Sequence, residues 1–562
     1  MHKCCLAVLA ACGIGCVGVI GSTEVGPGGA GTPGAGTPGA GASGGVAGGD
    51  PQLSVIAARY FPGQVLANPP KRLQRLTRTQ LDITTRTLLP AHYTTTAMAT
   101  FPPDPLQTNY EYAANLSFNP NNFTPYTTWV DQIAASVRAN PASVINCAAT
   151  NPTCLQTESK KFVSRAFRGT LTDTQLGRYS TFLTTSVPQV GLPVATADLV
   201  NLTLTSPNYV FRDEVLTDIS SLLLPAQRLQ NMTYTLADAP PEAIALSSVT
   251  PSASLQTPDD LQKTTDRILA TPEARTKLMR FFAAWLEIKE SDEFIIAPSV
   301  FPEFTPTVAA AVVEEARAFL SYQLSKAAPT LKDVTQSTES FVSNSLASIY
   351  GISNPGATKL VNLDPAQRLG IFTLPGVIAS HSGPTTTRLV KRGVFFTRKV
   401  MCLPLGQPPP SVDTAGILAA AVGTERQKVE SVTAVQPCTG CHTYINPFGF
   451  MQENYDAIGR WRTTDQGQPI NASISVDFLD EGRLSTTTPI DALKGFTNSM
   501  RFKQCFVRQL FRFYMGRDEV PADDPLLRNM FVNFAAGDAQ AIVEPLRVLG
   551  KSSSFSQRSE VP

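Results

Sequence analysis

The sequence has few charged residues for its length, and the two signs nearly cancel. Among 562 residues there are 46 Lys or Arg and 45 Asp or Glu, which leaves a net charge of +1. A protein that binds nucleic acid through its overall charge needs a positive excess. We therefore expect no nucleic-acid partner. The length exceeds what one hydrophobic core usually holds, so several domains or one large fused helical body are expected.

Motifs of several common enzyme classes are missing. The sequence has no Gly-rich phosphate loop, no G-x-S-x-G nucleophile elbow and no H-E-x-x-H zinc helix. Adjacent carboxylates such as Glu314 and Glu315 point apart on a helix, and we expect them on a solvated face. Hydrolase and nucleotide-binding functions are therefore not expected. No apolar run after the N-terminal segment is long enough to span a bilayer.

The N-terminus has the features of an export signal. One Lys precedes a short apolar run that ends in the letters LAAC at Cys12. This ending resembles the bacterial lipoprotein signal, in which the Cys becomes the acylated N-terminus. Cleavage near Cys16 and simple secretion are the alternatives. We expect a signal over residues 1–21, lipidation of Cys12, and an exported periplasmic or outer-membrane lipoprotein anchored to the membrane by lipid.

The next residues have the composition of a flexible spacer. Gly, Ala, Pro and Thr dominate residues 22–50, and such a segment cannot bury a core. We expect it to hold the folded part away from a membrane surface.

Residues 438–442 read CTGCH, the pattern of covalent haem attachment. Two thiols three positions apart on a helical turn can each add to one haem vinyl group. The adjacent imidazole then faces the iron. The pattern should arise by chance in about one sequence of this composition per thousand. We therefore predict one covalent c-type haem held by Cys438 and Cys441, with His442 as the proximal iron ligand.

Two other uses of the motif are less favoured. A zinc site needs a second ligand pair, and His92 and His381, the other histidines beyond the signal, lack zinc-finger spacing. A thioredoxin-like C-x-x-C follows a strand, whereas the preceding letters TERQKVESVTAVQP predict a helix and then a loop.

Residues near the motif are candidates for the haem pocket. Aromatic side chains after it could wall a haem crevice or belong to an ordinary core, and they are Phe448, Phe450, Tyr455 and Trp461. Arg460 and Arg462 could pair with haem propionates or be solvated. The sixth iron ligand stays open among Met500, Met401, Met451, Met515 and His381. A filled sixth position favours electron transfer, and an open one lets peroxide or oxygen bind.

The remaining cysteines suit an oxidising compartment. Beyond the signal the sequence has Cys147, Cys154, Cys402, Cys438, Cys441 and Cys505. If two hold haem, four remain, and these allow three pairings. Cys147 and Cys154 could close a short loop, which would leave Cys402 and Cys505 as the second pair.

Helical periodicity recurs along the chain. Apolar residues return every three or four positions in DDLQKTTDRILATPEARTKLMRFFAAWLEIKE and PTVAAAVVEEARAFLSYQLSKA. A helix is expected to run to Leu89, with Thr77 or Thr79 as its cap. From Arg501 to Tyr514 an aromatic stripe predicts a core-facing helix. Strand alternation is rare, so the fold class is mainly α.

Five segments together resemble one bacterial family of exported multidomain cytochromes, which carry domain of unknown function 1592 and its companions. RLTRTQLDITTRTLL resembles the 1587 segment, and SRAFRGTLTDTQLGRY the 1595 segment. SPNYVFRDEV, LPAQRLQNMTYTLADAPPEAIALSS and FFAAWLEI are similar to the 1592 segment. RLGIFTLPGVIASHSGPTTTRLVKRGVFFTRKVMCLPLGQPPP with CTGCHTYINPFGFMQENYDAIGRWR resembles the 1588 segment, and FKQCFVRQLFRFYMGRDEVPADD the 1585 segment.

The resemblance implies a largely helical fold with a cytochrome c-like part towards the C-terminus, and haem-based electron transfer to a redox partner protein. A haem-dependent peroxidase or oxygenase, and a surface-anchored assembly protein with structural haem, are the alternatives. The implied segments are 51–150 (1587-like), 151–200 (1595-like), 201–345 (1592-like), 346–480 (haem-bearing, 1588-like) and 481–562 (1585-like).

Overall fold

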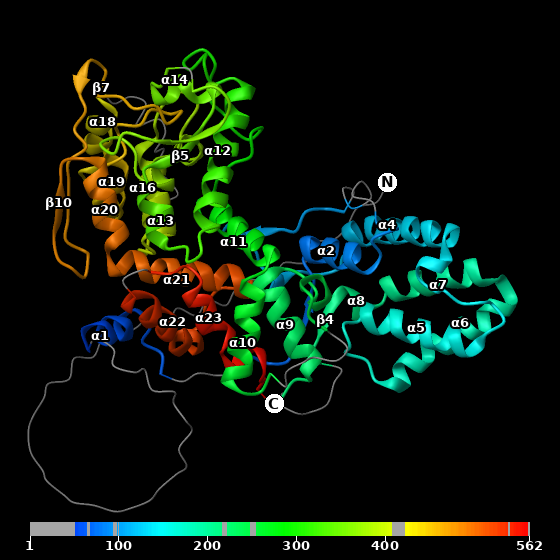
Figure 1. Ribbon diagram of the computed structural model, residues 1–562. Helices are drawn as coiled ribbons and strands as arrows, with labels where there is room; N and C mark the ends of the chain where they lie inside the picture. The colour runs from blue at the N-terminus through cyan, green and yellow to red at the C-terminus, as the bar shows by residue number, and fades with distance from the viewer. Residues whose placement is uncertain are drawn as a thin grey trace, which may run out of the picture. The chain divides into compact units, whose positions relative to one another are not determined.

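Helices make up most of the described chain, which confirms the mainly α prediction, and the strands form short antiparallel pairs (Figure 1). The computed structural model describes residues 51–64, 68–93, 98, 101–215, 222–247, 255–353, 355–406, 422–537 and 540–559. The predicted signal, the spacer and Cys12 lie outside these residues. The residues from Gly49 onward form one compact unit.

The helices and strands follow one another along the whole described chain. The helices are α1 Pro51–Tyr60, α2 Arg78–Leu88, α4 Pro120–Ala139, α5 Pro152–Ala166, α6 Asp173–Val190, α7 Leu192–Leu204, α8 Pro207–Val210, α9 Pro225–Ala237, α10 Pro258–Leu269, α11 Pro272–Trp285, α12 Pro306–Leu324, α13 Leu331–Gln336, α14 Ala347–Tyr350, α15 Pro375–Ser380, α16 Leu389–Phe395, the π-helix η6 Phe396–Val400, α18 Glu425–Thr433, α19 Thr439–Phe450, α20 Pro489–Asn498, α21 Met500–Met515, α22 Asp524–Ala536 and α23 Glu544–Gly550. Short 3-10 turns are η1 Ala113–Asn115, η2 Pro141–Ser143, η3 Pro241–Ile244, η4 Asn344–Leu346, η5 Ile371–Thr373, η7 Pro521–Asp523 and η8 Ser553–Phe555. The paired strands are β1 Leu73–Arg75 with β4 Phe211–Asp213, β2 Leu106–Gln107 with β3 Tyr110–Glu111, β5 Glu339–Val342 with β6 Lys359–Asn362, β7 Thr464–Asp465 with β8 Gln468–Pro469, and β9 Ile474–Val476 with β10 Leu484–Thr486.

Many of the 44 prolines start helices. In α10, α11, α12 and α20 a Thr side chain accepts a hydrogen bond from a backbone N–H of the first turn, and Pro follows at the first helical position. Proline suits this position because its missing N–H would have no partner there. The predicted cap Thr77 is confirmed, since it forms a reciprocal capping box with Gln80 at the start of α2.

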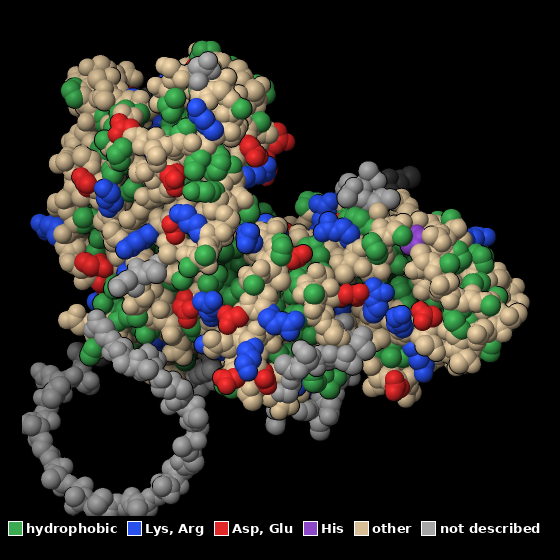
Figure 2. Space-filling model, in the orientation of Figure 1, with side chains coloured by type: hydrophobic (Ala, Val, Ile, Leu, Met, Phe, Trp, Pro, Cys, Tyr) green, Lys and Arg blue, Asp and Glu red, His purple; other side chains and the backbone are tan. Residues whose placement is uncertain are grey.

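Three hydrophobic cores organise the fold. The largest joins α1, α9–α11, α16, α19 and α20–α23, and the second lies among α2, α4–α7 and α9. The third packs α12 against β5 and β6. The predicted stripe of α21 is buried in the largest core, and α21 contacts α9, α11, α20, α22 and α23. Figure 2 shows positive and negative side chains interspersed on the face in view, as the small net charge suggests.

Helix α9 is buried on all sides although much of its sequence is polar. Ala226 to Ala237 are all buried. Asn231 donates to Glu214 at 2.8 Å, and Glu214 also accepts two hydrogen bonds from the fully buried Arg558 near the C-terminus. Asp238, just after α9, accepts from Lys277 and Arg280, each at 2.7 Å. Remote segments therefore supply partners for Glu214 and Asp238.

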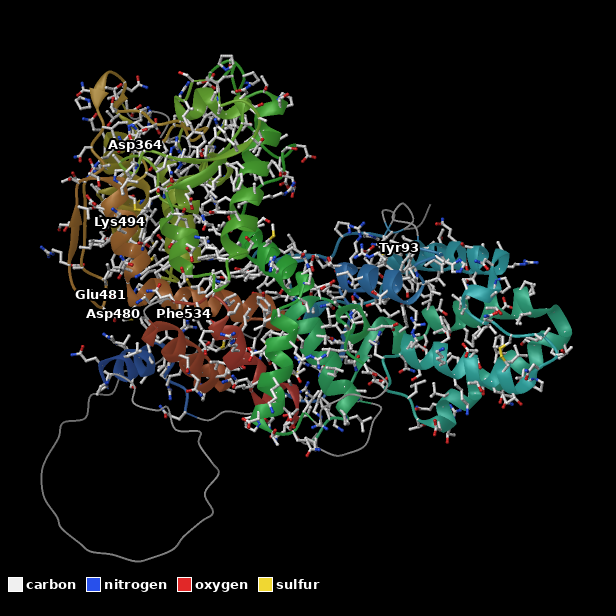
Figure 3. The ribbon with its side chains drawn as sticks, in the orientation of Figure 1. Tyr93, Asp364, Asp480, Glu481, Lys494 and Phe534 are labelled. Carbon is white, nitrogen blue, oxygen red and sulfur yellow. A yellow bond between two sulfur atoms is a disulfide. The ribbon has the colours of Figure 1, made fainter. Side chains whose placement is uncertain are left out.

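Two disulfides and an ion pair link further segments of the chain. Both predicted disulfides are confirmed: Cys147–Cys154 closes a short loop, and Cys402–Cys505 joins the end of η6 to α21. Asp480, labelled in Figure 3, pairs with Arg59 of α1 at 2.8 Å and accepts from Tyr60. Within the ranges given above, no helix combines the length and apolarity needed to cross a bilayer.

The prediction that Glu314 and Glu315 both lie on a solvated face is wrong for Glu315. Glu314 is exposed, but Glu315 is 1% exposed, because α12 turns it towards the third core. Ser340 and Tyr350 donate hydrogen bonds to its carboxyl group. Burial raises the pKa of Glu315 from 4.5 to about 7.

The raised pKa of Glu315 predicts a pH-dependent stability. The folded protein holds this proton more tightly than the unfolded chain. The stabilisation is therefore complete below pH 4.5 and is lost as the pH rises through about 7. Relative to Glu315→Gln, the wild type should lose about 3 kcal/mol of unfolding free energy over this window. Urea unfolding of both proteins at either end of the window measures this difference, and parallel pH profiles would contradict the prediction.

Candidate functional site

The CTGCH motif occupies the first turns of α19. Cys438 is the residue before the helix, and its carbonyl accepts from the His442 backbone N–H at 3.1 Å. The preceding residues form α18 and then a turn, as the sequence predicts. Cys438 and Cys441 are both half-buried free thiols and are not joined in a disulfide. Two thiols and one imidazole therefore lie within one helical segment.

A chain of side-chain hydrogen bonds fixes the ring of His442. Its Nδ1 lies 2.8 Å from Oδ1 of Asn446, and Asn446 Nδ2 donates to the Thr433 hydroxyl at 2.9 Å. That hydroxyl donates to the Val429 carbonyl at 2.7 Å within α18. Because Oδ1 can only accept, Nδ1 carries the ring proton. Nε2 then has its lone pair free, which is the form that binds a metal.

Two glycines allow α19 to pack closely against α16. A Cβ on Gly393 would lie 2.3 Å from the Ile445 carbonyl oxygen, and a Cβ on Gly449 would lie 2.4 Å from the Leu389 carbonyl oxygen. Both distances are shorter than any real Cβ contact. The helix that carries His442 is therefore held against α16 by direct backbone contact.

Arg392 of α16 supports the other end of α19. It is fully buried, and its guanidinium donates to the carbonyl oxygens of Gln452, Tyr455 and Asp456, between 2.8 and 3.1 Å away. These carbonyls belong to the turn that follows α19. A single cation therefore ties the segment after α19 to α16.

The predicted wall residues lie towards the end of α19 opposite the motif. Phe448 and Phe450 belong to the largest core, where the Phe448 ring packs 4.6 Å from that of Phe496. Tyr455 and Trp461 pack edge to face beyond the helix, with ring centroids 5.4 Å apart. All four rings thus have protein partners.

The two arginines predicted for haem propionates are already paired. Arg460 contacts Asp456 at 3.0 Å and also pairs with Glu303. Arg462 contacts Asp465 at 2.9 Å and also pairs with Glu453. Burial raises the pKa of the Glu453 carboxyl to about 7. A role for Arg460 or Arg462 towards propionates stays a prediction.

Two of the five candidates for a sixth ligand are committed elsewhere. His381 donates from Nε2 to the Leu286 carbonyl at 2.9 Å and stacks on Phe395, and burial lowers its pKa to about 3. Met451 directly follows the end of α19, about 14 Å from His442 along the helix axis, so the two cannot flank one iron. Among the rest, Met401 and Met515 are buried and Met500 is half-buried.

The donor set fits a covalent haem. Both thiols are free, they lie on one helical turn, and an imidazole with its Nε2 available follows them. Zinc would need further ligands, and within the described ranges no group of three or more His, Cys, Asp or Glu side chains is placed to hold a metal. Asn446, which positions His442, was not among the predicted site residues, although its place four residues after His442 puts both on one helix face.

Three family models match the chain, in the order that the resemblance predicts. Residues 74–139 match the protein of unknown function DUF1587, residues 225–352 match DUF1592, and residues 368–465 match DUF1588. The third match contains the CTGCH motif and Asn446. The 1595-like and 1585-like segments stay predictions. No curated protein and no solved structure matches the chain.

Close packing of α16 on α19 predicts a large effect for Gly393→Ala. The added methyl meets backbone that cannot move aside, so the unfolding free energy should fall by about 1–3 kcal/mol. Gly177→Ala in α6 is the matched control, because a Cβ there meets nothing within 4 Å. That control should gain about 0.5–1 kcal/mol from helix propensity. Equal effects of the two substitutions in urea unfolding would refute the packing argument.

Proposed function

We propose that this chain, which belongs to the multidomain family joining domains of unknown function 1587, 1592 and 1588, is an exported c-type cytochrome. One haem would be held covalently by Cys438 and Cys441, with His442 as the proximal iron ligand. The protein would pass electrons to a redox partner protein outside the cytoplasm. A lipid on Cys12 would anchor it to the membrane. The haem-bearing residues would form a cytochrome c-like part towards the C-terminus.

One observation carries the proposal: free thiols and an oriented imidazole lie together at the start of a helix. The thiols of Cys438 and Cys441 are half-buried, so they are partly accessible from solvent. Asn446 holds the imidazole in the tautomer that leaves Nε2 free. A structural or redox C-x-x-C needs no adjacent histidine fixed in this way, whereas attachment of haem needs all three side chains.

The side chains around the motif would position and tune the site. A bound haem supplies a one-electron couple of ferric and ferrous iron. Asn446 holds the Nδ1 proton of His442, and Thr433 fixes Asn446. The contacts of Gly393 and Arg392 keep α19 in place, so that His442 does not move when the charge of the site changes. Small movement on electron transfer is what a carrier requires.

A haem-dependent oxidoreductase is the second candidate. It is favoured by the hydrogen bond of His381 and by the position of Met451 at the end of α19, which remove two of the predicted sixth ligands. An iron with an open position would bind peroxide or oxygen. Met500 is half-buried at the start of α21. If it were the sixth iron ligand, the iron would have no open position, and the electron-carrier function would be favoured.

The first prediction of this proposal is a covalently retained haem. The full chain is expressed with a haem-attachment system, and its spectrum is recorded after denaturing extraction of free haem. The wild type should keep its haem, and Cys438→Ala/Cys441→Ala should lose it. Cys147→Ala/Cys154→Ala is the matched control, because it also removes two cysteines but should keep the haem. Absence of covalent haem from the wild type would overturn the proposal.

The same sample separates the candidate functions. Sharp reduced bands that carbon monoxide leaves unchanged indicate a six-coordinate carrier, and a band shift indicates the oxidoreductase. If the cysteine variant unfolds while electron exchange with small redox mediators is undetectable in the wild type, the haem is structural.

The second prediction concerns Asn446. Asn446→Asp places a carboxylate on the Nδ1 proton of His442, which makes the ring a stronger donor and favours ferric iron. The midpoint potential should fall, on the order of tens of millivolts. Asn529→Asp adds the same charge at an exposed position of α22 and should leave the potential nearly unchanged. Equal shifts in spectroelectrochemical titration would show that Asn446 does not act on His442.

A further inference from the structure

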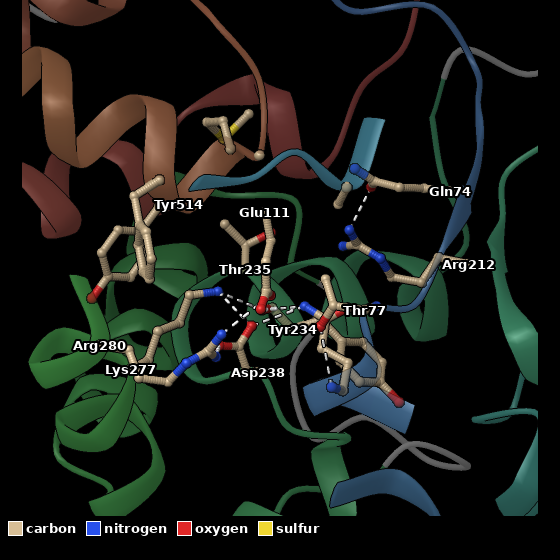
Figure 4. A pocket seen from close by; sticks show the side chains of 15 residues that line it. Gln74, Thr77, Glu111, Arg212, Tyr234, Thr235, Asp238, Lys277, Arg280 and Tyr514 are labelled. Carbon is tan, nitrogen blue, oxygen red and sulfur yellow. Dashed lines mark hydrogen bonds and ion pairs between the residues drawn. The ribbon is translucent and has the colours of Figure 1, made fainter. Parts of the chain in front are cut away.

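We propose that a polar cavity between α9, α11 and β4 binds a small monocarboxylate, with Arg212 as its anchor. The cavity has a volume of about 30 Å³, and its walls also include parts of β1, α2, β3 and the end of α21 (Figure 4). This space holds about two water molecules, which is also the size of a carboxylate group with one or two carbons. No residue of α19 lines it, so the site is separate from the CTGCH motif.

Arg212 is a buried cation with free donors. It is 5% exposed, and one nitrogen, Nη2, donates to the Oε1 atom of Gln74. Its Nε and Nη1 have no hydrogen-bond partner within the part of the chain that the structure describes. A buried N–H without a partner costs free energy, and native proteins seldom leave one unmatched. Figure 4 shows Arg212 extending into the pocket from the side opposite Lys277.

The charge of Arg212 also lacks a counterion of its own. Glu214 is the carboxylate that acts on it, but both Glu214 oxygens accept hydrogen bonds from Arg558. Arg72 lies 3.8 Å from the same carboxylate. Three arginines thus share one negative charge. Burial lowers the pKa of Arg212 to about 10, which agrees with an uncompensated cation.

The opposite wall adds positive charge that is already balanced. Lys277 and Arg280 each contact Asp238 at 2.7 Å, and Arg280 also contacts Glu111 at 3.1 Å. The cavity lining therefore holds three cations, counting Arg212, against two carboxylates. A monoanion would complete the balance, whereas a dianion would be repelled by Asp238 and Glu111.

The cavity has an entrance and a further donor. The side chains of Arg280 and Glu111 are 32% and 27% exposed, so their ion pair forms the side open to solvent. Thr235 lines the cavity, and its hydroxyl has no partner among the described residues. A carboxylate that enters past Arg280 can accept from Arg212 and from this hydroxyl. The guanidinium suits this ligand because its planar N–H groups match carboxylate oxygens.

Isothermal titration of the full chain with sodium acetate tests the proposal. Sodium chloride and sodium sulfate at the same ionic strength are the comparison ligands. Acetate should bind at one site per chain, and sulfate should bind no better than chloride. Arg212→Gln should weaken acetate binding at least tenfold. Thr235→Val, which keeps the side-chain shape, should weaken it several-fold. Arg547→Gln changes an arginine of α23 outside the cavity and should leave acetate binding unchanged.

Each outcome decides the matter. No acetate-specific heat in the wild type means that the cavity holds water, and the proposal fails. Equal affinity in the wild type and Thr235→Val, together with equal affinity in Arg212→Gln, places the acetate elsewhere and also refutes it. If Arg212→Gln does not fold, weaker acetate binding by Thr235→Val supports the proposal, and equal affinity in the wild type and Thr235→Val refutes it.

Discussion

Burial of the polar helix α9 is the constraint on which the rest of the structure depends. The buried polar side chains of this helix need partners from other parts of the protein, because little water reaches them. Asn231 therefore needs Glu214, and Glu214 needs Arg558 from the far end of the chain. Asp238 needs Lys277 and Arg280 of α11. Breaking such a buried pair typically costs about 3–5 kcal/mol, so these contacts hold remote segments together.

The helix that carries the CTGCH motif is attached to this body through the largest core. Helix α19 is fixed along its side by Gly393 and Gly449, which let two backbones touch, and at its end by Arg392. Only its first turns, with the two thiols and His442, are left half-buried. The arrangement gives a rigid support for a group added from outside. It suits a proposed cofactor that must be attached after export and then held without movement.

The same constraint accounts for the proposed carboxylate site. Arginines gather around α9 because Glu214 needs partners, and Arg212 is the one left without a counterion. The cavity beside it is lined by residues that lie far from α9 in the sequence but close to it in the fold, such as Gln74, Lys277 and Tyr514. A chain built as a simple electron carrier has no evident need for this second site. A large helical body with its own proposed ligand would explain why the part proposed to bear haem is only a fraction of the protein.

The sequence alone determined the features that depend on neighbours within one or two turns. Helix periodicity, the Thr77 cap, the spacing of CTGCH and the short Cys147–Cys154 loop are all of this kind, because local geometry decides them. The tertiary structure decided what depends on packing between distant segments. It buried Glu315 where a solvated face was expected, and it left Arg212 with free donors. Burial of a charge is set by what packs against it, and a single helix face does not reveal that.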